Sequence, residues 1–181
     1  MRNHNHQEEY SLPLPFTYIH QGLPEAFTWS NVNGTSYLTR PLNQHLPQYC
    51  GSCFVHAAMS SLADRIKIAR MTNHADEDAQ ASGPDINLSI QFILNCGAGI
   101  AGSCEGGSAS GVFELIKQMG YVPYETCMPY IACSSESTEG FCPHANTECT
   151  PMNICRTCNN PSKGGTCTEV RTRNHTVVHS D

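Results

Sequence analysis

Eleven cysteines in a chain of 181 residues constrain the fold more than any other feature of this sequence. Such a density is typical of secreted or lumenal proteins whose folds depend on disulfides, and it is rare in the cytosol. The number is odd, so at least one thiol has no partner within the chain. We expect a protein of an oxidising compartment, and because residues 1–10 are polar we expect its targeting signal to lie outside this sequence. The alternative is a cytosolic protein whose cysteines bind metal.

The charge and hydropathy of the chain exclude two classes of partner. Lys and Arg total 10 against 16 Asp and Glu, which gives a net charge of −6, and the basic residues are scattered. A basic surface for nucleic acid is therefore not expected. Apolar runs such as Phe92–Leu94 are far shorter than the ~20 residues that a membrane span needs. We expect no membrane partner.

Helical periodicity is concentrated in the middle of the chain, and cysteines are concentrated near its end. The apolar spacing from Val55 to Ala69 predicts a long, largely buried helix from Cys53 to about Arg70. Shorter helices are expected over 88–94, capped by Asn87 or Asp85, and over 108–119, ended by Gly120. Alternation predicts a strand over 170–178. Seven cysteines fall within 127–167, a segment with too few apolar side chains to form its own core.

Cys53 lies at the first turn of the long helix. Unpaired N–H groups and the helix dipole favour an anion at that position, and a thiolate is the form of cysteine that acts as a nucleophile. Two other functions are open. A redox pair with Cys50 would need a βαβ pattern, which the proline-rich upstream segment does not supply, and a zinc site with Cys155 and Cys158 would far exceed zinc-ribbon spacing. Two structural half-cystines are the third alternative.

The segment around Cys53 resembles the active-site segment of the papain-like cysteine peptidases. Residues 44–57 read QHLPQYCGSCFVHA. The similarity extends to Ser30–Gly34, Ala63–Ile66, Leu88–Gln91, Asn95–Gly97, Gly102–Gly107, Glu125–Cys127, Cys155–Cys158 and Cys167. The resemblance implies an α+β fold of the papain-like type, with a helical left-hand domain, disulfide-rich loops and a β-rich right-hand domain that is largely missing. It divides the chain into a leader or prosegment remnant (1–24), the helical half (25–150), and a disulfide-rich crossover with the first strand of the β half (151–181).

The resemblance assigns catalytic roles to two residues. Cys53 matches the nucleophile that forms a thioester with the substrate. Gln44 matches the glutamine whose side-chain N–H joins the Cys53 amide in an oxyanion hole. Gln48 is the rival glutamine, and an ordinary loop amide is the alternative for Gln44. Phe54 departs from the family signature, which has Trp or Tyr after the cysteine.

The resemblance also implies residues that bind substrate. His45 lies in a three-residue insertion, His45–Pro47, that resembles the loop of a carboxypeptidase branch of the family, in which the histidine binds the C-terminal carboxylate of the substrate. A solvent-exposed loop histidine is the alternative. Gly106 and Gly107 match the glycine pair that lines the cleft and lets the substrate backbone approach. A tight turn after Cys104 is the alternative for the pair.

The family pattern further implies the disulfide pairing, the partners and the location of the protein. Cys53 is left as the free thiol, and Cys133 and Cys142 lie in what looks like an insertion. We expect no cofactor and no metal, a peptide or protein substrate, a monomer, and a lysosomal or extracellular location. The expected pairs are Cys50–Cys104, Cys96–Cys149, Cys127–Cys155, Cys158–Cys167 and Cys133–Cys142.

A catalytic histidine and asparagine are expected about 130–150 residues beyond the cysteine, near residues 183–203, so we expect both to lie beyond Asp181. His175 and His179 are nearer alternatives within the chain. His56 shares the helix of Cys53, and we expect it to be packed or capped rather than catalytic.

The sequence thus predicts a cysteine peptidase, acting as a carboxypeptidase and present as an incomplete chain. The alternative is a catalytically inactive, disulfide-rich relative that binds peptides or a partner protein.

Overall fold

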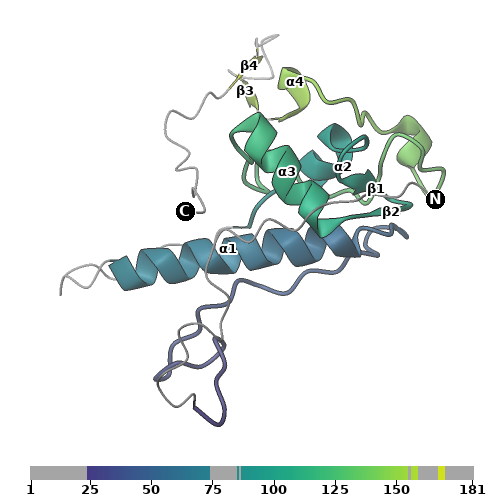
Figure 1. The fold of residues 1–181 in the computed structure, drawn as a ribbon. Helices are drawn as coiled ribbons and strands as arrows, with labels where there is room; N and C mark the ends of the chain where they lie inside the picture. Colours follow the sequence, from purple (N-terminus) through teal and green to yellow (C-terminus); the bar gives the residue numbers. More distant parts are fainter. Residues whose placement is uncertain (1–23, 74–84, 86, 155, 159–166, 170–181) are drawn as a thin grey trace.

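The structure is a computed structural model that describes residues 24–73, 85, 87–154, 156–158 and 167–169. Three α-helices form its body, and α2 and α3 lie together above one half of the long helix α1 (Figure 1). The described helices are α1 (Cys53–Asn73), α2 (Ile90–Cys96), α3 (Ala109–Met119), α4 (Pro151–Ile154) and the 3-10 helix η2 (Cys142–His144). The described strands are β1 (Gly102–Ser103), β2 (Gly106–Gly107), β3 (Arg156–Cys158) and β4 (Cys167–Glu169).

Helix α1 begins at Cys53 as the sequence predicts, and it runs three residues beyond the expected Arg70. Its first half is the buried part: Val55, Ala58, Met59 and Ala63 are each at most 3% exposed. Leu62 and Ile66 are only partly buried, and Ala69 is exposed, so burial declines along the helix. The far end of α1 projects beyond the body of the molecule (Figure 1). None of the helices described is long and apolar enough to cross a membrane.

Helix α2 shows that the predicted cap was wrong. The helix begins at Ile90, and Ser89 caps it, its side chain accepting from the amide of Phe92 at 3.1 Å. Leu88 forms a β-bridge with Tyr124 instead of starting the helix. Neither Asn87 nor Asp85 is therefore the cap, because the helix starts downstream of both. Serine is as good an N-cap as either residue, and Ser89 lies only two residues after Asn87 and four after Asp85.

Helix α3 confirms its prediction more closely. It ends at Met119, and Gly120 follows in the left-handed region with φ 73°. The amide of Gly120 donates to the carbonyl of Ile116, which closes the helix. Val112 and Leu115 are buried. With Phe92, Ile93 and Leu94 of α2 they form the apolar core against α1.

The described sheets are two short hairpins. Strands β1 and β2 pair antiparallel, with Gly102 opposite Gly107, and β3 and β4 pair antiparallel, with Cys158 opposite Cys167. The α+β class predicted from the sequence is confirmed, with a helical body and little sheet among the residues that the structure covers. The strand expected over 170–178 lies outside those residues, as does the leader expected over 1–24 except for its last residue.

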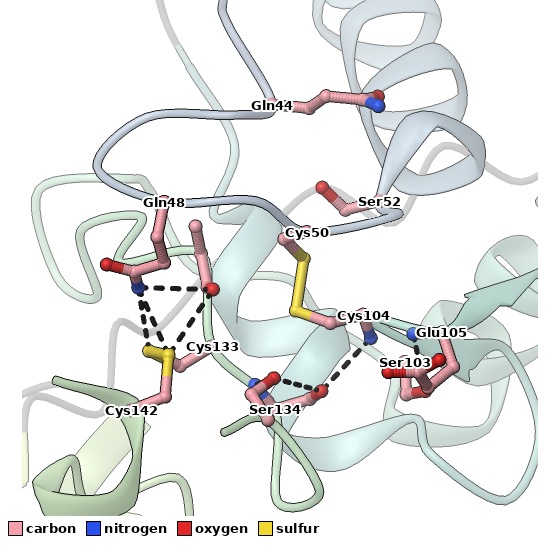
Figure 2. The surroundings of a disulfide bond; sticks show 12 residues. Gln44, Gln48, Cys50, Ser52, Ser103, Cys104, Glu105, Cys133, Ser134 and Cys142 are labelled. Carbon is pink, nitrogen blue, oxygen red and sulfur yellow. Dashed lines mark hydrogen bonds between the residues drawn. A yellow bond between two sulfur atoms is a disulfide. The ribbon is translucent and has the colours of Figure 1, made fainter. Parts of the chain in front are cut away.

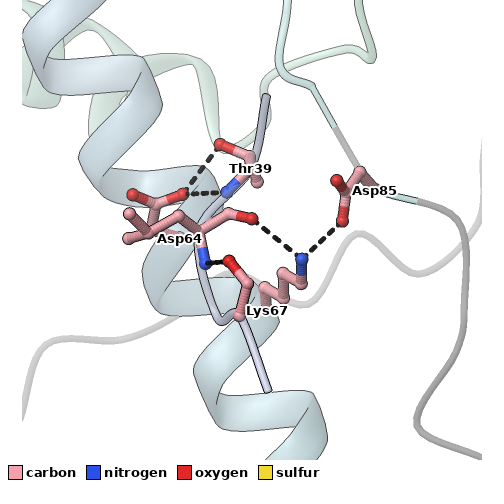
Figure 3. Close-up of polar contacts among 6 residues, drawn as sticks. Thr39, Asp64, Lys67 and Asp85 are labelled. Atoms are coloured by element: carbon pink, nitrogen blue, oxygen red, sulfur yellow. Dashed lines mark hydrogen bonds and ion pairs between the residues drawn. The ribbon is translucent and has the colours of Figure 1, made fainter. Parts of the chain in front are cut away.

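The segment before the cysteine motif is tied to the middle of α1 by polar contacts (Figure 3). The carboxylate of Asp64 accepts from both the amide and the hydroxyl of Thr39, each at 2.7 Å. Lys67, one turn further along α1, donates to the carbonyl of Leu38 at 2.8 Å and pairs with Asp85 at 2.7 Å. These contacts fix the path of the chain into the loop that contains Gln44.

Candidate active site

Cys53 is exposed at the first residue of α1, and it is the free cysteine among those that the structure describes. The carbonyl of Ser52 accepts from the amides of Val55 and His56 at 3.1 and 3.0 Å, which closes the first turn. The amides of Cys53 and Phe54 have no acceptor within the helix, because residues four positions earlier lie outside it. Cys53 thus combines an accessible thiol with a helix N-terminus that favours an anion.

The loop before Cys53 is fixed to the loop before β2 by a disulfide, shown in Figure 2, and by a backbone hydrogen bond. Cys50 is fully buried and forms a disulfide with Cys104. The amide of Gly51 donates to the carbonyl of Cys104 at 2.7 Å. A Cβ at position 51 would lie 2.6 Å from that carbonyl oxygen, so only glycine allows the approach. Because Cys50 is bonded to Cys104, it does not form the redox pair with Cys53 that the sequence left open.

Gln44 and His45 lie beside each other in the preceding loop. The side-chain amino nitrogen of Gln44 lies 3.0 Å from Nε2 of His45, and the amide nitrogen of Cys50 lies 3.5 Å from Nδ1 of the same ring. An amide amino group only donates, so Nε2 of His45 is the acceptor of the hydrogen bond from Gln44. The amino group of Gln44 thus points to the ring of His45. This is the group that an oxyanion hole requires.

Tyr49 holds the His45 ring from the other side. The two rings are stacked, with centroids 4.7 Å apart and planes 8° apart. His45 and Tyr49 are both exposed, as is Leu46 between them. The insertion therefore presents an imidazole at the surface next to Gln44, where a substrate can reach it.

Gln48 has a different environment from Gln44. Its side-chain amino group donates to the carbonyl of Ile131 at 2.6 Å and lies about 3 Å from both sulfur atoms of the Cys133–Cys142 disulfide, at 3.0 and 3.1 Å. In Figure 2 its side chain points to these cysteines, whereas that of Gln44 points away from them. The amino group of Gln48 is therefore engaged in contacts that hold its loop to the Ile131–Cys142 segment. Gln44 is the glutamine that remains available for the candidate site.

The glycine pair lies next to the cysteine motif. A Cβ on Gly107 would stand 2.5 Å from the ring of Phe54, the residue after Cys53, so the glycine makes room for that ring. Phe54 is 8% exposed, and a phenyl ring thus fills the position where the family signature has a larger aromatic residue. Gly106 has φ +115°, and a Cβ there would meet nothing within 4 Å. The open space at Gly106 is what a substrate backbone needs for a close approach.

His56 and Tyr130 lie behind the first turn of α1. Nδ1 of His56 lies 3.0 Å from the carbonyl oxygen of Ser52, and the two rings meet edge to face at 5.0 Å. Burial lowers the pKa of His56 from 6.5, and the charge of His45 acts in the same direction, against the hydrogen bond to Ser52 and the charge of Glu125. Burial also raises the pKa of Tyr130, although the Ser52 hydroxyl opposes the shift. His56 is packed and partly buried here, in line with the sequence analysis.

The other expected residues are placed only in part. Cys96–Cys149 is a disulfide, as is Cys133–Cys142. Cys127 is disulfide-bonded, while its expected partner Cys155 lies outside the described residues. The described part of the chain also excludes His175, His179 and the side chains of Cys158 and Cys167. Among the described side chains, no group of three or more His, Cys, Asp or Glu could hold a metal ion.

Tyr130 is the member of this site that the sequence analysis missed. Its hydroxyl donates to the carbonyl of Gln44 and lies beside the hydroxyl of Ser52. Tyr130 follows Pro129 in a cysteine-rich segment, where neither apolar periodicity nor a motif spacing marks it as functional. It also lies 77 residues beyond Cys53 in the chain. Only the fold brings it to Ser52, the residue before Cys53.

Comparison with known proteins identifies the family. The model of the papain family cysteine proteases matches residues 23–180. A cathepsin Z from Onchocerca volvulus is 40% identical over 129 residues, which cover 69% of this chain and 38% of the relative. A viral cathepsin from Epiphyas postvittana nucleopolyhedrovirus is 32% identical over 119 residues, which cover 66% of this chain and 29% of the relative. The matched regions thus span less than two fifths of either relative. The chain belongs to the papain family of cysteine proteases.

Proposed function

We propose that this protein is a cysteine peptidase that removes residues from the C-terminus of peptide or protein substrates. Cys53 attacks the scissile carbonyl, and the thiol sulfur forms a thioester while the amine of the leaving residue departs with a proton. The amino group of Gln44 and the amide of Cys53 donate to the oxyanion. The supporting observation is an exposed, free thiol at the start of α1, in a chain of the papain family.

His45 is the residue that makes this a carboxypeptidase. A substrate cut near its C-terminus carries a carboxylate on the leaving side, and an imidazolium beside it makes a charge-assisted hydrogen bond. His45 is exposed, held by Tyr49, and adjacent to Gln44. A chain cut in its interior has no charge at that point, so the contact favours C-terminal residues.

The remaining parts of the proposal follow from the same chemistry. The nucleophile needs a base, which we place on a histidine outside the described residues. The substrate is a peptide or protein, and the enzyme acts as a monomer without cofactor or metal. Three disulfides in the described region support an oxidising compartment, and we place the protein in the lysosome or outside the cell.

The test is hydrolysis at pH 5, by the whole protein, of two peptides that differ only in a free or amidated C-terminus. The expected result is faster release of the last residue from the free acid. His45→Ala should lower that rate about 10-fold, the value of one charge-assisted hydrogen bond, and leave interior cleavage unchanged. His144→Ala, at an exposed position on η2, is the matched control. Binding of both peptides without hydrolysis of either would instead identify an inactive, peptide-binding relative.

A further inference from the structure

The phenol of Tyr130 lies between the two segments that carry the candidate site. Its hydroxyl is 2.7 Å from the carbonyl oxygen of Gln44 and 2.7 Å from the hydroxyl of Ser52. A carbonyl only accepts, so the single phenol proton is donated to Gln44. The Ser52 hydroxyl therefore donates to Tyr130. One side chain thus joins the backbone of the proposed oxyanion glutamine to the residue that precedes Cys53.

His56 extends this set of contacts by one member. Its Nδ1 lies 3.2 Å from the Ser52 hydroxyl oxygen and 3.0 Å from the Ser52 carbonyl oxygen. The hydroxyl proton of Ser52 is already donated to Tyr130, so both oxygens act as acceptors toward His56. Nδ1 must then carry the proton of the neutral ring. The hydrogen bonds run in one direction, from His56 to Ser52, from Ser52 to Tyr130, and from Tyr130 to Gln44.

The environment of Nε2 of His56 favours this direction of the hydrogen bonds. Nε2 is buried and has no hydrogen-bond partner among the described residues. With the proton on Nδ1, Nε2 carries only a lone pair, whereas the other tautomer would bury an unpaired N–H group and remove the donor to Ser52. The lowered pKa of His56 acts in the same sense, because it favours the neutral ring.

We propose that Tyr130 is a positioning residue, whose hydroxyl fixes the backbone of Gln44 relative to the first turn of α1. This inference rests on the proposed function, since it requires Gln44 and the Cys53 amide to share one oxyanion. Donors of an oxyanion hole act only when they are held within about 0.5 Å of the productive geometry. Gln44 lies in a loop, and Cys53 lies on a helix. The Tyr130 hydroxyl connects the backbone of Gln44 to Ser52, the residue directly before that helix.

The test compares two reactions of Cys53 that differ in their need for the oxyanion hole. A peptide nitrile forms a reversible thioimidate: Sγ adds to the nitrile carbon, one π bond opens, and the nitrogen takes up the thiol proton. That nitrogen occupies the place of the oxyanion. Iodoacetamide alkylates the same sulfur with loss of iodide and needs no such donors. Tyr130→Phe should weaken nitrile binding about 10-fold, and leave the alkylation rate within about 2-fold, because it removes one hydrogen bond and not the thiol.

Two further variants make the result specific. Tyr37→Phe removes a phenol from the aromatic cluster with Trp29, away from the site, and should match the wild type in both reactions. Gln44→Ala should weaken nitrile binding, and adding Tyr130→Phe to it should cause no further loss, because Tyr130 acts through Gln44. Additive losses in the double variant would contradict the inference.

The outcomes separate this inference from the proposed function. If the wild type is alkylated at Cys53 but binds no nitrile, the proposed function fails, and the inference fails with it. If the wild type binds the nitrile and Tyr130→Phe binds it equally well, only the inference is overturned. If Tyr130→Phe does not fold, Ser52→Ala decides the question. It should show the same selective loss of nitrile binding, and full affinity in that variant would contradict the inference.

Discussion

Gly107 lies against the ring of Phe54, so close that a Cβ atom at position 107 would stand 2.5 Å from Cζ of the ring. This contact links the β1–β2 hairpin to the residue directly after the proposed nucleophile. The Phe54 ring therefore occupies the space that a side chain at position 107 would need. A larger residue at either position would force the ring or the hairpin to move.

Gly107→Ala should lower the free energy of unfolding by about 1–3 kcal/mol, because overpacking forces the Phe54 ring or the hairpin to move. Gly99→Ala is the matched control, since a Cβ there would meet nothing within 4 Å. That control should change stability by less than about 0.5 kcal/mol. Urea unfolding of both variants makes the comparison. Equal stabilities would show that the hairpin does not lie on the ring as described.

Asp64 should stabilise the folded protein by anchoring the segment that leads into the candidate site. Asp64→Ala removes the acceptor of two hydrogen bonds from Thr39 and should cost about 1.5–3 kcal/mol, the value for bonds to a charged group. The exposed Arg65 is the control on the same helix, and Arg65→Ala should have little effect. Chemical denaturation measures both. A loss at Arg65 that equals the loss at Asp64 would exclude the anchoring role.

His56 should make the protein less stable as the pH falls. Its pKa in the folded state is lowered by burial, so between that value and 6.5 the unfolded chain binds a proton that the folded chain does not. The contribution is fully present at pH 7 and is lost as the pH falls through this window. His56→Gln keeps a donor for Ser52 and should show a smaller decrease in unfolding free energy from pH 7 to pH 5.

The control for this pH dependence is His144→Gln, the same change at an exposed position. It should leave the difference in unfolding free energy between the two pH values unchanged. Identical slopes for His56→Gln and the wild type would contradict the assignment of the effect to His56.

Gln48 should stabilise the disulfide-bonded segment from Ile131 to Cys142 rather than take part in catalysis. Gln48→Ala leaves the carbonyl of Ile131 without its 2.6 Å donor and should cost about 1–2 kcal/mol. Hydrogen exchange over residues 131–142 should also become faster. Gln118→Ala on α3 loses only an exposed pair with Glu114 and should cost about 0.2–0.5 kcal/mol. Unchanged exchange in Gln48→Ala would rule out this stabilising role.

The sequence predicted those parts of the fold that depend on local patterns. The start of α1 at Cys53 follows from apolar periodicity, and the end of α3 follows from Gly120, whose positive φ suits glycine. The cap of α2 was wrong, because Asn87, Asp85 and Ser89 are all good caps and the choice depends on the bridge between Leu88 and Tyr124. Local sequence does not contain that long-range contact.

The sequence predicted the candidate site residues that belong to a recognisable motif, and it did not predict the others. Cys53, Gln44 and the glycine pair follow from a family resemblance, and so does the Cys50–Cys104 disulfide. The preference for Gln44 over Gln48 also came from the resemblance, and the structure adds that the Gln48 side chain lies against the Cys133–Cys142 disulfide. Tyr130 could not be found from the sequence, because its role comes only from two hydrogen bonds to segments far away in the chain.

The most direct test of Cys53 as the nucleophile is the mass of the whole protein after brief incubation with a peptide nitrophenyl ester at pH 5. The sulfur of Cys53 should displace nitrophenol and gain one acyl group, and peptide mapping should place that group on Cys53. Cys53→Ala should gain none. Acyl transfer to a different residue, or no acylation of a wild-type protein whose Cys53 is alkylated by iodoacetamide, would contradict the account.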